Sequence, residues 1–562
     1  MKTIAIILIT VWVSFQSMAQ IAPQKYFIAF MDKTNSPYSV TRPQEFLSAR
    51  SIERRQKQGI AIAENDLPVN QTYINAIRNF GAVILTRSKW FNGVTIYCLN
   101  PLIIDSILTL PFVKHVFKNS FSNKVKNYIP DNKHMSEEAL RESFGKITIP
   151  TNSVNIGNRG FDYGPSYRQI HMLNGDSLHK MGYRGEGKVI AILDAGFFNA
   201  DTLRAFDSLM ADNQILGTKD FVNPGNNVYH EYEHGMEVLS CIGGNIPGEL
   251  IGTAPKAKFW LLRTEDYNSE NLIEEYNWVS GAEFADSAGA DIINSSLGYT
   301  EFDNTLVNHT CNDMSGNTTP ATRGANLAFS KGMIVVNSAG NEGGSAWKCV
   351  SAPADGFDVL AIAAVDSNGI RASFSSTGEA ARRIKPNVAA MGRSVVVSST
   401  IGTIMHSSGT SFSSPIIAGL VACLWEAAPL WKNTDITRAI ELSSSQVSHP
   451  DSLLGYGIPD FIKALKVVSV RESETQSGIH IYPNPFTDRF FVVIIDGSAQ
   501  ALDLFLYDLS GRMVRSFSKL VATAGENLVP VEELSGLEPG NYLLKVVGHD
   551  FITNVKMIKI NR

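Results

Sequence analysis

The feature that most constrains this chain is an alternation of continuous apolar runs with helix-like stretches between residues 163 and 467. The apolar runs are rich in β-branched and aliphatic residues, which is typical of strands buried on both faces. Such strands, alternating with helices, predict an α/β domain with a mostly parallel sheet flanked by helices. In these sheets the reacting groups lie at the carboxyl ends of the strands. The predicted strands are 188–193, 258–262, 292–293, 333–336 and 359–363, and the predicted helices are 235–243, 272–288, 323–331 and 413–426.

The composition is that of a globular protein, and it excludes several classes. Apolar residues make up 44% of the 562 residues and charged residues 18%, so the chain is neither wholly disordered nor fibrous. The formal net charge of -5 lacks the basic excess of a general nucleic-acid binder, so we expect no nucleic-acid partner. The length predicts three to four domains at about 150 residues each.

Residues 1–19 predict a secretory signal peptide. Lys2 precedes an apolar run over 4–15, and the small residues Ser17 and Ala19 follow it. The run is shorter than the about 18 apolar residues of a membrane span, and no other stretch reaches that length, so we expect no transmembrane span. The alternative is a buried N-terminal helix. The signal favours a secreted or outer-surface location.

Five cysteines are too few for a disulfide scaffold, although export permits a disulfide. Cys311 and Cys349 both lie in loop-like text rich in Gly, Asn and Ser, so they are the expected pair. Cys241 and Cys423 lie in helix-like apolar runs and are expected to be buried free thiols.

Residues 20–118 predict a compact α+β unit. Helices packed on one antiparallel sheet are typical of the ferredoxin-like pattern. Residues 119–162 are polar and irregular, and they predict a linker that a protease could reach. The expected strands are 26–30, 82–86, 94–98 and 113–117, and the expected helices are 43–58, 69–80 and 102–110.

The C-terminal part of the chain has a different character. Residues 468–479 predict a polar linker. From 480 to 562, short strand-like runs are separated by turn residues such as Pro539-Gly540, which predicts an all-β sandwich. The expected strands are 490–495, 502–507, 542–547 and 554–560.

Four polar side chains stand next to predicted strand ends or helix starts. Asp194 follows the first predicted strand, where a buried carboxylate needs a partner for its charge. His234 precedes the first predicted helix, whose dipole keeps an imidazole neutral and able to act as a general base. Ser411 lies on a glycine-bent loop before the last predicted helix, and Asn341 could donate its amide to an oxyanion. Structural roles are the alternative: turn residues for Asp194 and Asn341, a structural histidine, and a helix N-cap for Ser411.

A zinc site is an alternative assignment for one of these residues. His230 and His234 bracket an H-E-x-x-H pattern, which is typical of zinc peptidases. That interpretation needs both histidines on one continuous helix and a third ligand, for which Glu249 or Glu265 could serve. The preceding text, 223–227, is loop-like. We therefore keep a zinc peptidase using His230 and His234 as an alternative and expect no metal ligand in the favoured site.

The order of these residues resembles the subtilisin-like serine proteases. Asp194, His234 and Ser411 follow the Asp…His…Ser order of subtilisin. Further segments match the family's motifs in the same order along the chain. The resemblance predicts a subtilisin-like peptidase domain over 163–467. The matching segments are 252–255 (Gly-Thr-Ala-Pro), 293–298 (Ile-Asn-Ser-Ser-Leu-Gly), 372–378 (Ala-Ser-Phe-Ser-Ser-Thr-Gly) and 385–388 (Lys-Pro-Asn-Val).

The resemblance implies a secreted serine endopeptidase that works through an acyl-enzyme. Ser411 would attack the scissile carbonyl and His234 would take and return the proton. Asp194 would orient the imidazole, and Asn341 would hold the oxyanion together with the N–H of Ser411. Ala195 departs from the family pattern, which has Ser or Thr after the aspartate, and Met236 replaces the usual Thr. The alternative is a catalytically inactive surface or adhesin protein on the same fold.

The resemblance also implies how substrates bind. The substrates would be polypeptides that pair with the main chain of the cleft. Glu342 would lie near the specificity pocket and could favour basic side chains. No cofactor is implied for catalysis, while structural calcium is allowed. The implied substrate-binding residues are Ser296, Leu297, Gly298, Ala339, Gly340 and Glu342.

The two flanking units resemble parts of related Bacteroidetes precursors. Residues 20–118, with the text at 67–69 and 88–94, resemble an inhibitory propeptide, which would block the cleft and be cut off within 119–162. The tail resembles the C-terminal sorting domain of the type IX secretion system, through Tyr-Pro-Asn-Pro at 482–485 and Pro-Gly-Asn-Tyr at 539–542. That machinery would then be a partner. The alternative for the tail is a generic carbohydrate- or protein-binding sandwich.

Overall fold

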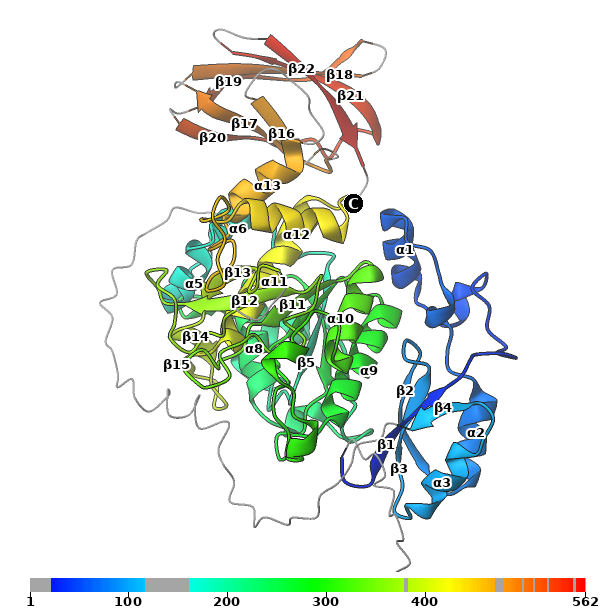
Figure 1. The fold of residues 1–562 in the computed structure, drawn as a ribbon. Helices are drawn as coiled ribbons and strands as arrows, with labels where there is room; N and C mark the ends of the chain where they lie inside the picture. Colours follow the sequence, from blue (N-terminus) through cyan, green and yellow to red (C-terminus); the bar gives the residue numbers. More distant parts are fainter. Residues whose placement is uncertain are drawn as a thin grey trace, which may run out of the picture.

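The computed structural model describes residues 22–116, 161–378, 383–470 and most of 479–560, which form three units in chain order (Figure 1). The N-terminal unit lies beside the central domain, and the C-terminal unit lies beyond α12 (Asn433–Leu442) and α13 (Phe461–Val470). The predicted signal peptide, nearly all of the linker predicted at 119–162 and most of the one predicted at 468–479 lie outside the described residues.

The N-terminal unit is a four-stranded antiparallel sheet in the order β2-β3-β1-β4. Its apolar core joins the sheet to two helices through buried residues such as Ile28, Ile74 and Ile104. This arrangement confirms the predicted ferredoxin-like pattern. The elements are β1 (Lys25–Phe30), α2 (Gln71–Asn79), β2 (Val83–Ser88), β3 (Gly93–Tyr97), α3 (Leu102–Leu108) and β4 (Val113–Val116).

A third helix, α1 (Ala49–Gln58), stands apart from that core and contacts the central domain (Figure 1). The prediction of one helix over 43–58 was wrong at its start. Ser48 is the N-cap, and its hydroxyl accepts a hydrogen bond from the N–H of Ser51, so the helix begins at Ala49.

The central domain is built on a seven-stranded parallel sheet in the order β13-β12-β11-β10-β5-β9-β6. Along β5 (Val189–Asp194), Ile190 and Ile192 pack in the core with α8 (His234–Gly243) and α11 (Thr410–Ala427). Ala191 and Leu193 point to the other face and pack in the core with α9 (Ile273–Ala288) and α10 (Pro320–Ser330). The sheet is therefore covered by helices on both faces, as the sequence predicted. The strands are β5 (Val189–Asp194), β6 (Ile215–Asp220), β9 (Lys258–Arg263), β10 (Ile292–Ser295), β11 (Ile334–Ser338), β12 (Leu360–Val365) and β13 (Val388–Met391).

The other elements of this domain are helices and two short antiparallel hairpins. The long helices are α8 (His234–Gly243), α9 (Ile273–Ala288), α10 (Pro320–Ser330) and α11 (Thr410–Ala427). The shorter elements are α5 (Tyr167–His171), α6 (Gly175–Lys180), α7 (Asp207–Ala211), β7 (Asn245–Ile246), β8 (Leu250–Ile251), β14 (Val395–Ser398) and β15 (Ile404–Ser407).

The start of α11 differs from the prediction. The helix begins at Thr410, so Ser411 lies in its first turn and not on a loop before it. The N-cap is Gly409, which makes no side-chain cap, so Ser411 is not the N-cap of α11. Among the described residues, α11 is the one helix long and apolar enough to cross a membrane, and 94% of it is buried inside the domain.

The C-terminal unit is a β-sandwich of two antiparallel sheets, as predicted. One sheet has the order β16-β17-β20 and the other β19-β18-β21-β22, and apolar side chains from both form one core. The strands are β16 (Ile479–Tyr482), β17 (Phe490–Gly497), β18 (Gln500–Asp508), β19 (Met513–Ala522), β20 (Gly525–Val531), β21 (Gly540–Val547) and β22 (Ile552–Lys559).

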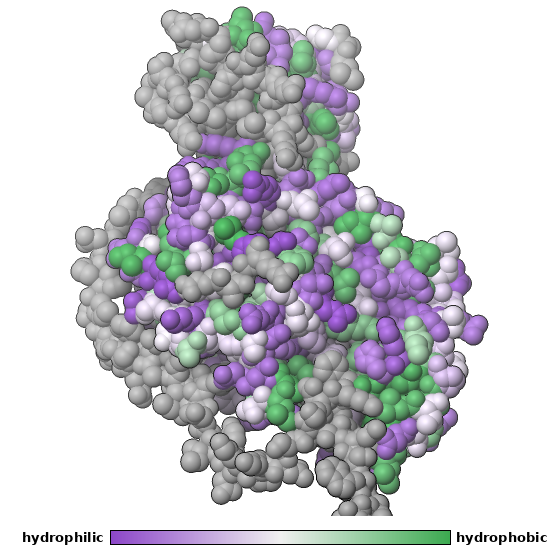
Figure 2. Space-filling view, viewed as in Figure 1, coloured by the Kyte–Doolittle hydropathy of each residue, from purple (hydrophilic) through white to green (hydrophobic). Residues whose placement is uncertain are grey.

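The visible face of the central domain is mostly hydrophilic, and hydrophobic colour gathers more densely over the N-terminal unit (Figure 2). Large apolar side chains of that unit are indeed exposed: Phe80, Val83, Leu99 and Leu102.

Candidate active site

Asp194 and His234 meet at the carboxyl edge of the parallel sheet. Asp194 is the last residue of β5, and His234 is the first residue of α8. The Nδ1 atom of His234 lies 2.8 Å from Oδ1 of Asp194. Asp194 is fully buried, and His234 is 9% exposed. The Oδ1 atom of Asp194 also accepts a hydrogen bond from the N–H of Ala195, at 2.8 Å, so the backbone orients the carboxylate that faces the imidazole.

Two glycines allow this approach. A Cβ on Gly235 would lie 2.4 Å from the carbonyl oxygen of Gly196 and 2.8 Å from Cβ of Asp194. A Cβ on Gly196 would lie 2.4 Å from the backbone nitrogen of Tyr232. Real Cβ atoms do not come that close to other atoms, so the end of β5 and the start of α8 can touch only because both positions lack a side chain.

Ser411 and Asn341 converge on the start of α11. The Oδ1 atom of Asn341, which follows β11, accepts hydrogen bonds from both the N–H and the hydroxyl of Thr410, each 2.9 Å long. The carbonyl oxygen of Ser411 accepts a hydrogen bond of 2.8 Å from the hydroxyl of Ser296. The ring centroids of His234 and Phe412, the residue after Ser411, are 6.0 Å apart. The structure therefore brings all four sequence-predicted residues to one edge of the sheet.

The residues predicted to bind substrate follow β10 and β11 at the same edge. Ser296 and Leu297 directly follow β10, and the backbone of Leu297 is tied to β11 by a 3.0 Å hydrogen bond from the amide of Asn337. A Cβ on Gly298 would lie 2.3 Å from the hydroxyl oxygen of Ser351, and one on Gly340 would lie 3.1 Å from the same atom. Ser351 is thus the residue that lies between the two segments. Our sequence reasoning missed it, since a lone serine in loop text carries no signal.

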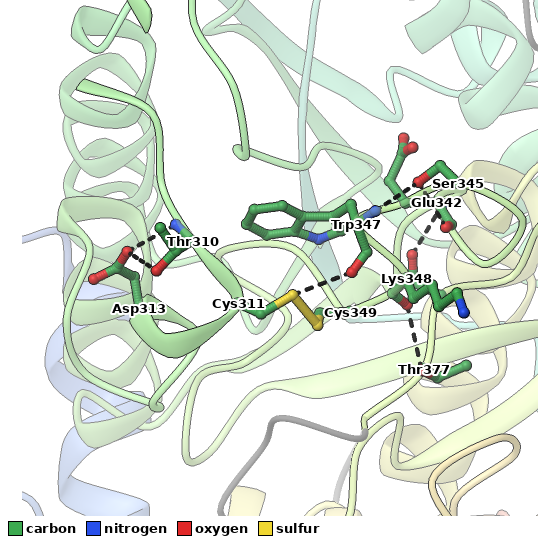
Figure 3. Close-up of a disulfide and its surroundings, with 10 residues drawn as sticks. Thr310, Cys311, Asp313, Glu342, Ser345, Trp347, Lys348, Cys349 and Thr377 are labelled. Atoms are coloured by element: carbon green, nitrogen blue, oxygen red, sulfur yellow. Dashed lines mark hydrogen bonds between the residues drawn. A yellow bond between two sulfur atoms is a disulfide. The ribbon is translucent and has the colours of Figure 1, made fainter. Parts of the chain in front are cut away.

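A disulfide joins the loops that follow these two segments, as predicted (Figure 3). Cys311 lies in the loop between β10 and α10, and Cys349 lies in the loop after Asn341. In that loop the N–H of Glu342 donates to the hydroxyl of Ser376 at 3.0 Å. Glu342 as a specificity residue stays a prediction. Cys98, Cys241 and Cys423 are buried free thiols, which confirms the expectation for the last two.

The zinc interpretation fails at its first requirement. His230 ends a short 3-10 helix (Val228–His230), whereas His234 begins α8, so the two histidines do not share one continuous helix. The candidate third ligands are engaged elsewhere: Glu249 pairs with Arg204, and Glu265 accepts a hydrogen bond from the hydroxyl of Tyr299. In the described ranges no group of three or more His, Cys, Asp or Glu side chains is placed to hold a metal ion. Structural calcium stays a prediction.

The N-terminal unit is attached to α9 through two buried carboxylates, those of Glu283 and Asp286. Glu283 accepts hydrogen bonds from the hydroxyl of Ser88 at 2.5 Å and from the N–H groups of Lys89 and Trp90 at 2.7 Å and 3.0 Å. Burial raises the pKa of Glu283 to about 7, although Lys89 and these hydrogen bonds act against it.

Asp286, one turn further along α9, contacts three cations of the N-terminal unit. Arg54, Arg55 and Lys89 lie 2.6 Å, 2.8 Å and 2.9 Å from its carboxylate oxygens. Burial raises the pKa of Asp286, but the charges of these three residues outweigh that effect and hold the pKa well below its usual value. The contact between the two units therefore contains buried ion pairs, beside apolar packing in which the ring of Phe27 stacks on that of Tyr276 in α9, with ring centroids 4.5 Å apart.

Comparison with known families assigns the three units. The subtilase family matches residues 185–457, the Peptidase S8 propeptide domain of Bacteroidota matches residues 25–135, and the secretion system C-terminal sorting domain matches residues 480–561.

Similar proteins cover the central part of the chain. Subtilisin E of Bacillus subtilis is 29% identical over 286 residues, which are 50% of this chain and 66% of that protein. A thermostable alkaline protease of Halalkalibacterium halodurans is 29% identical over 290 residues, which are 51% of this chain and 70% of that protein. The crystal structure of MycP1 without its N-terminal propeptide matches at a TM-score of 0.41 and 21% identity, and covers 53% of this chain and 96% of that one.

The three matches follow the chain in the order predicted for a propeptide, a peptidase domain and a sorting domain. The sorting domain indicates type IX export, which gives a secreted or outer-surface location. The central domain of this chain therefore matches the subtilase family over residues 185–457, where the chain is also similar to subtilisins.

Proposed function

We propose that this chain is the precursor of an exported serine endopeptidase and that Asp194, His234 and Ser411 form its catalytic triad. The observation that carries the proposal is the 2.8 Å contact between His234 Nδ1 and Asp194 Oδ1 at the sheet edge where α11 begins. A fully buried carboxylate in this position holds one tautomer of the imidazole and stabilises the imidazolium that forms during the reaction.

The proposed mechanism assigns one task to each side chain. Because Nδ1 of His234 faces Asp194, proton transfer falls to Nε2. Ser411 Oγ attacks the scissile carbonyl carbon and gives its proton to His234, which passes it to the leaving amine as the C–N bond breaks. Water then hydrolyses the acyl-enzyme by the same proton path. The substrates are polypeptides.

Asn341 is the proposed oxyanion donor. Both hydrogen bonds from Thr410 go to its Oδ1 atom, which fixes the amide with its donor atom, Nδ2, on the other side. An amide donor held in this way costs no reorganisation when negative charge develops on the carbonyl oxygen. The N–H of Ser411 would be the second donor.

The N-terminal domain is the proposed intramolecular inhibitor, and the type IX machinery is the proposed export partner of the sorting domain. The anchoring of the propeptide domain on α9 through Glu283 and Asp286 supports inhibition by a unit that stays in place before the chain is cut. We propose that the enzyme itself makes the cut within 119–162.

The test compares Ser411→Ala with the wild-type chain. We expect a fluorophosphonate probe to label processed wild type and not the variant, which should accumulate as full-length precursor with kcat lower by about 10⁶. Ser330→Ala, an exposed serine at the end of α10, is the matched control and should be labelled and processed normally. Normal trimming of Ser411→Ala would refute self-processing.

The alternatives give different results in the same experiment. An inactive surface protein would show neither labelling nor peptide hydrolysis. A zinc peptidase would hydrolyse peptides without labelling and would lose activity in a chelator. Either result in a matured wild-type sample would overturn the proposal.

A further inference from the structure

A buried arginine joins the loop that follows Asp194 (the Asp194 loop) to the loop that precedes His234 (the His234 loop). Arg263 is the last residue of β9, and it pairs in register with Asp194 on β5 and with Asp220 on β6. The arginine is only 2% exposed. A guanidinium keeps its charge in proteins, so its burial is tolerated only with well-placed anionic partners and hydrogen bonds.

The guanidinium of Arg263 reaches both loops at once. Its Nε atom donates to the carbonyl oxygen of Ala195, 3.0 Å away, in the residue next to Asp194. Its Nη2 atom lies 3.3 Å from Oε2 of Glu231, in the loop that leads into α8. Its Nη1 atom donates to Oδ2 of Asp220 at 3.0 Å, whereas Oδ1 of Asp266 lies 3.8 Å from Nη2.

Asp220 is itself held in place by hydrogen bonds, so it is a fixed partner for the guanidinium of Arg263. Its other oxygen, Oδ1, accepts hydrogen bonds of 2.8 Å from the N–H groups of Val222 and Asn223. The planar guanidinium therefore has one fixed partner and two partners that belong to the loops flanking the proposed catalytic pair.

The same two loops are joined by backbone hydrogen bonds. The N–H groups of Phe197 and Asn199 donate to the carbonyl oxygens of Val228 and Tyr229, at 2.9 Å each. The separation between Asp194 and His234 is therefore set by how these loops pack. Arg263 contacts the first loop directly beside Asp194, at the carbonyl oxygen of Ala195.

The carboxylate of Asp194 depends on this backbone. Its Oδ1 atom accepts from the N–H of Ala195 and faces His234, whereas Oδ2 is buried without a hydrogen-bond partner among the described residues. A Ser or Thr at position 195, as in the family pattern, would add a hydroxyl beside this carboxylate. Ala195 has none, so its N–H orients the carboxylate and Arg263 holds its carbonyl.

We propose that Arg263 is a positioning residue for the catalytic pair, whose guanidinium fixes the Asp194 loop against the His234 loop in place of a side-chain hydroxyl at 195. The inference rests on the proposed function, because it assigns how that site is held together. Arg263 touches neither substrate nor reacting atoms.

The test is Arg263→Lys, which keeps the charge beside Asp220 and loses the fork that reaches both loops. We expect kcat to fall about 10- to 100-fold with KM within about twofold, since a shift of about 1 Å between reacting groups costs about 10². Active sites in the processed full chain are counted by fluorophosphonate labelling, so a smaller folded fraction is not read as a slower enzyme.

Two further variants keep the proposal testable if Arg263→Lys does not fold. Glu231→Gln removes only the ion pair between Arg263 and Glu231, whose side chain is half-buried. It should lower kcat by about threefold to tenfold. Asp266→Asn is the matched control, because its carboxylate lies beyond hydrogen-bond distance at 3.8 Å, and it should keep the wild-type kcat. If Arg263→Lys does fold, a third variant that adds Ala195→Ser to it should recover part of the lost kcat by placing a hydroxyl beside Asp194.

A readout independent of turnover completes the test. In the Ser411→Ala precursor, the proton resonance of the Nδ1–H between His234 and Asp194 should be present, and Arg263→Lys should shift it upfield or broaden it away. Wild-type kcat per labelled site together with an unchanged resonance would overturn the proposal. If wild type is not labelled, the proposed function fails, while the resonance still reports whether Arg263 positions the pair.

Discussion

Asp194 and Asp286 are two fully buried carboxylates of the same domain, and they are satisfied in opposite ways. Asp286 contacts three permanent cations contributed by the propeptide domain. Asp194 faces one imidazole, and its second oxygen has no hydrogen-bond partner among the described residues.

The difference separates an anchoring carboxylate from a reacting one. Asp286 gains its full stabilisation once the propeptide domain is docked, and its low pKa keeps it ionised. Asp194 gains its strongest partner only when His234 takes a proton, so its interaction energy appears as the reaction proceeds. A buried carboxylate with a hydrogen-bond partner on only one of its oxygens therefore distinguishes the proposed catalytic edge from the anchoring contact.

The largest expected effect is on the catalytic side of this comparison. Asp194→Asn preserves the shape of the side chain but favours the wrong imidazole tautomer, so kcat should fall by about 10⁴ with little change in KM. Steady-state kinetics on processed protein, normalised to labelled sites, checks this. A loss below tenfold would mean that Asp194 is not the orienting carboxylate.

The second effect concerns the anchoring side. Asp286→Asn leaves Arg54 and Lys89 buried without their anionic partner, so the Ser411→Ala precursor should lose about 3–5 kcal/mol in free energy of unfolding. Denaturant titration measures it. Glu53→Gln, which breaks an exposed pair with Lys57, should cost less than about 1 kcal/mol. Equal losses of unfolding free energy in the two variants would show that the buried contacts of Asp286 contribute no more to stability than an exposed ion pair.

The third effect tests the close approach on the catalytic side. Gly235→Ala would force a Cβ to within 2.8 Å of the Asp194 side chain, so the pair must separate and kcat should fall by about 10². Gly344→Ala is the matched control, because a Cβ there meets no heavy atom within 4 Å. Similar kcat values for the two variants would contradict the steric argument.

The smallest effect is the pH dependence of the anchoring side. Glu283 has a pKa of about 7 when the propeptide domain covers it, against an ordinary value of 4.5. The docked state therefore binds the proton more tightly, and its extra stability is present below about pH 4.5 and is lost as the pH rises through about 7. The Tm of the Ser411→Ala precursor should fall relative to its Glu283→Gln derivative over this range. A difference in Tm between the two proteins that stays constant over this pH range would show that Glu283 does not titrate within it.

Much of the fold follows from the sequence because burial leaves a periodic signal. The five predicted strands of the central sheet match β5, β9, β10, β11 and β12 to within two residues. The sequence analysis missed two strands: β6, whose residues are partly exposed and lack a continuous apolar run, and β13, whose buried run is only four residues long. It also placed the start of α11 too late, because glycine, serine and threonine are poor helix formers in isolation and tertiary packing overrides that preference.

The candidate site was predictable to the extent that its residues stand at strand ends and helix starts. Asp194, His234, Asn341 and Ser411 could be named from such positions and from their order. Ser351 and Arg263 could not, because neither lies in a recognisable motif.

The sequence by itself determined where strands and helices form and which polar groups reach the carboxyl edge of the sheet, since those properties depend on local periodicity. Only the tertiary structure decided which charges meet: Arg263 with Ala195 and Glu231, and Asp286 with the propeptide arginines. The partners of a buried charge come from distant parts of the chain, and no local pattern encodes the distance at which they pack.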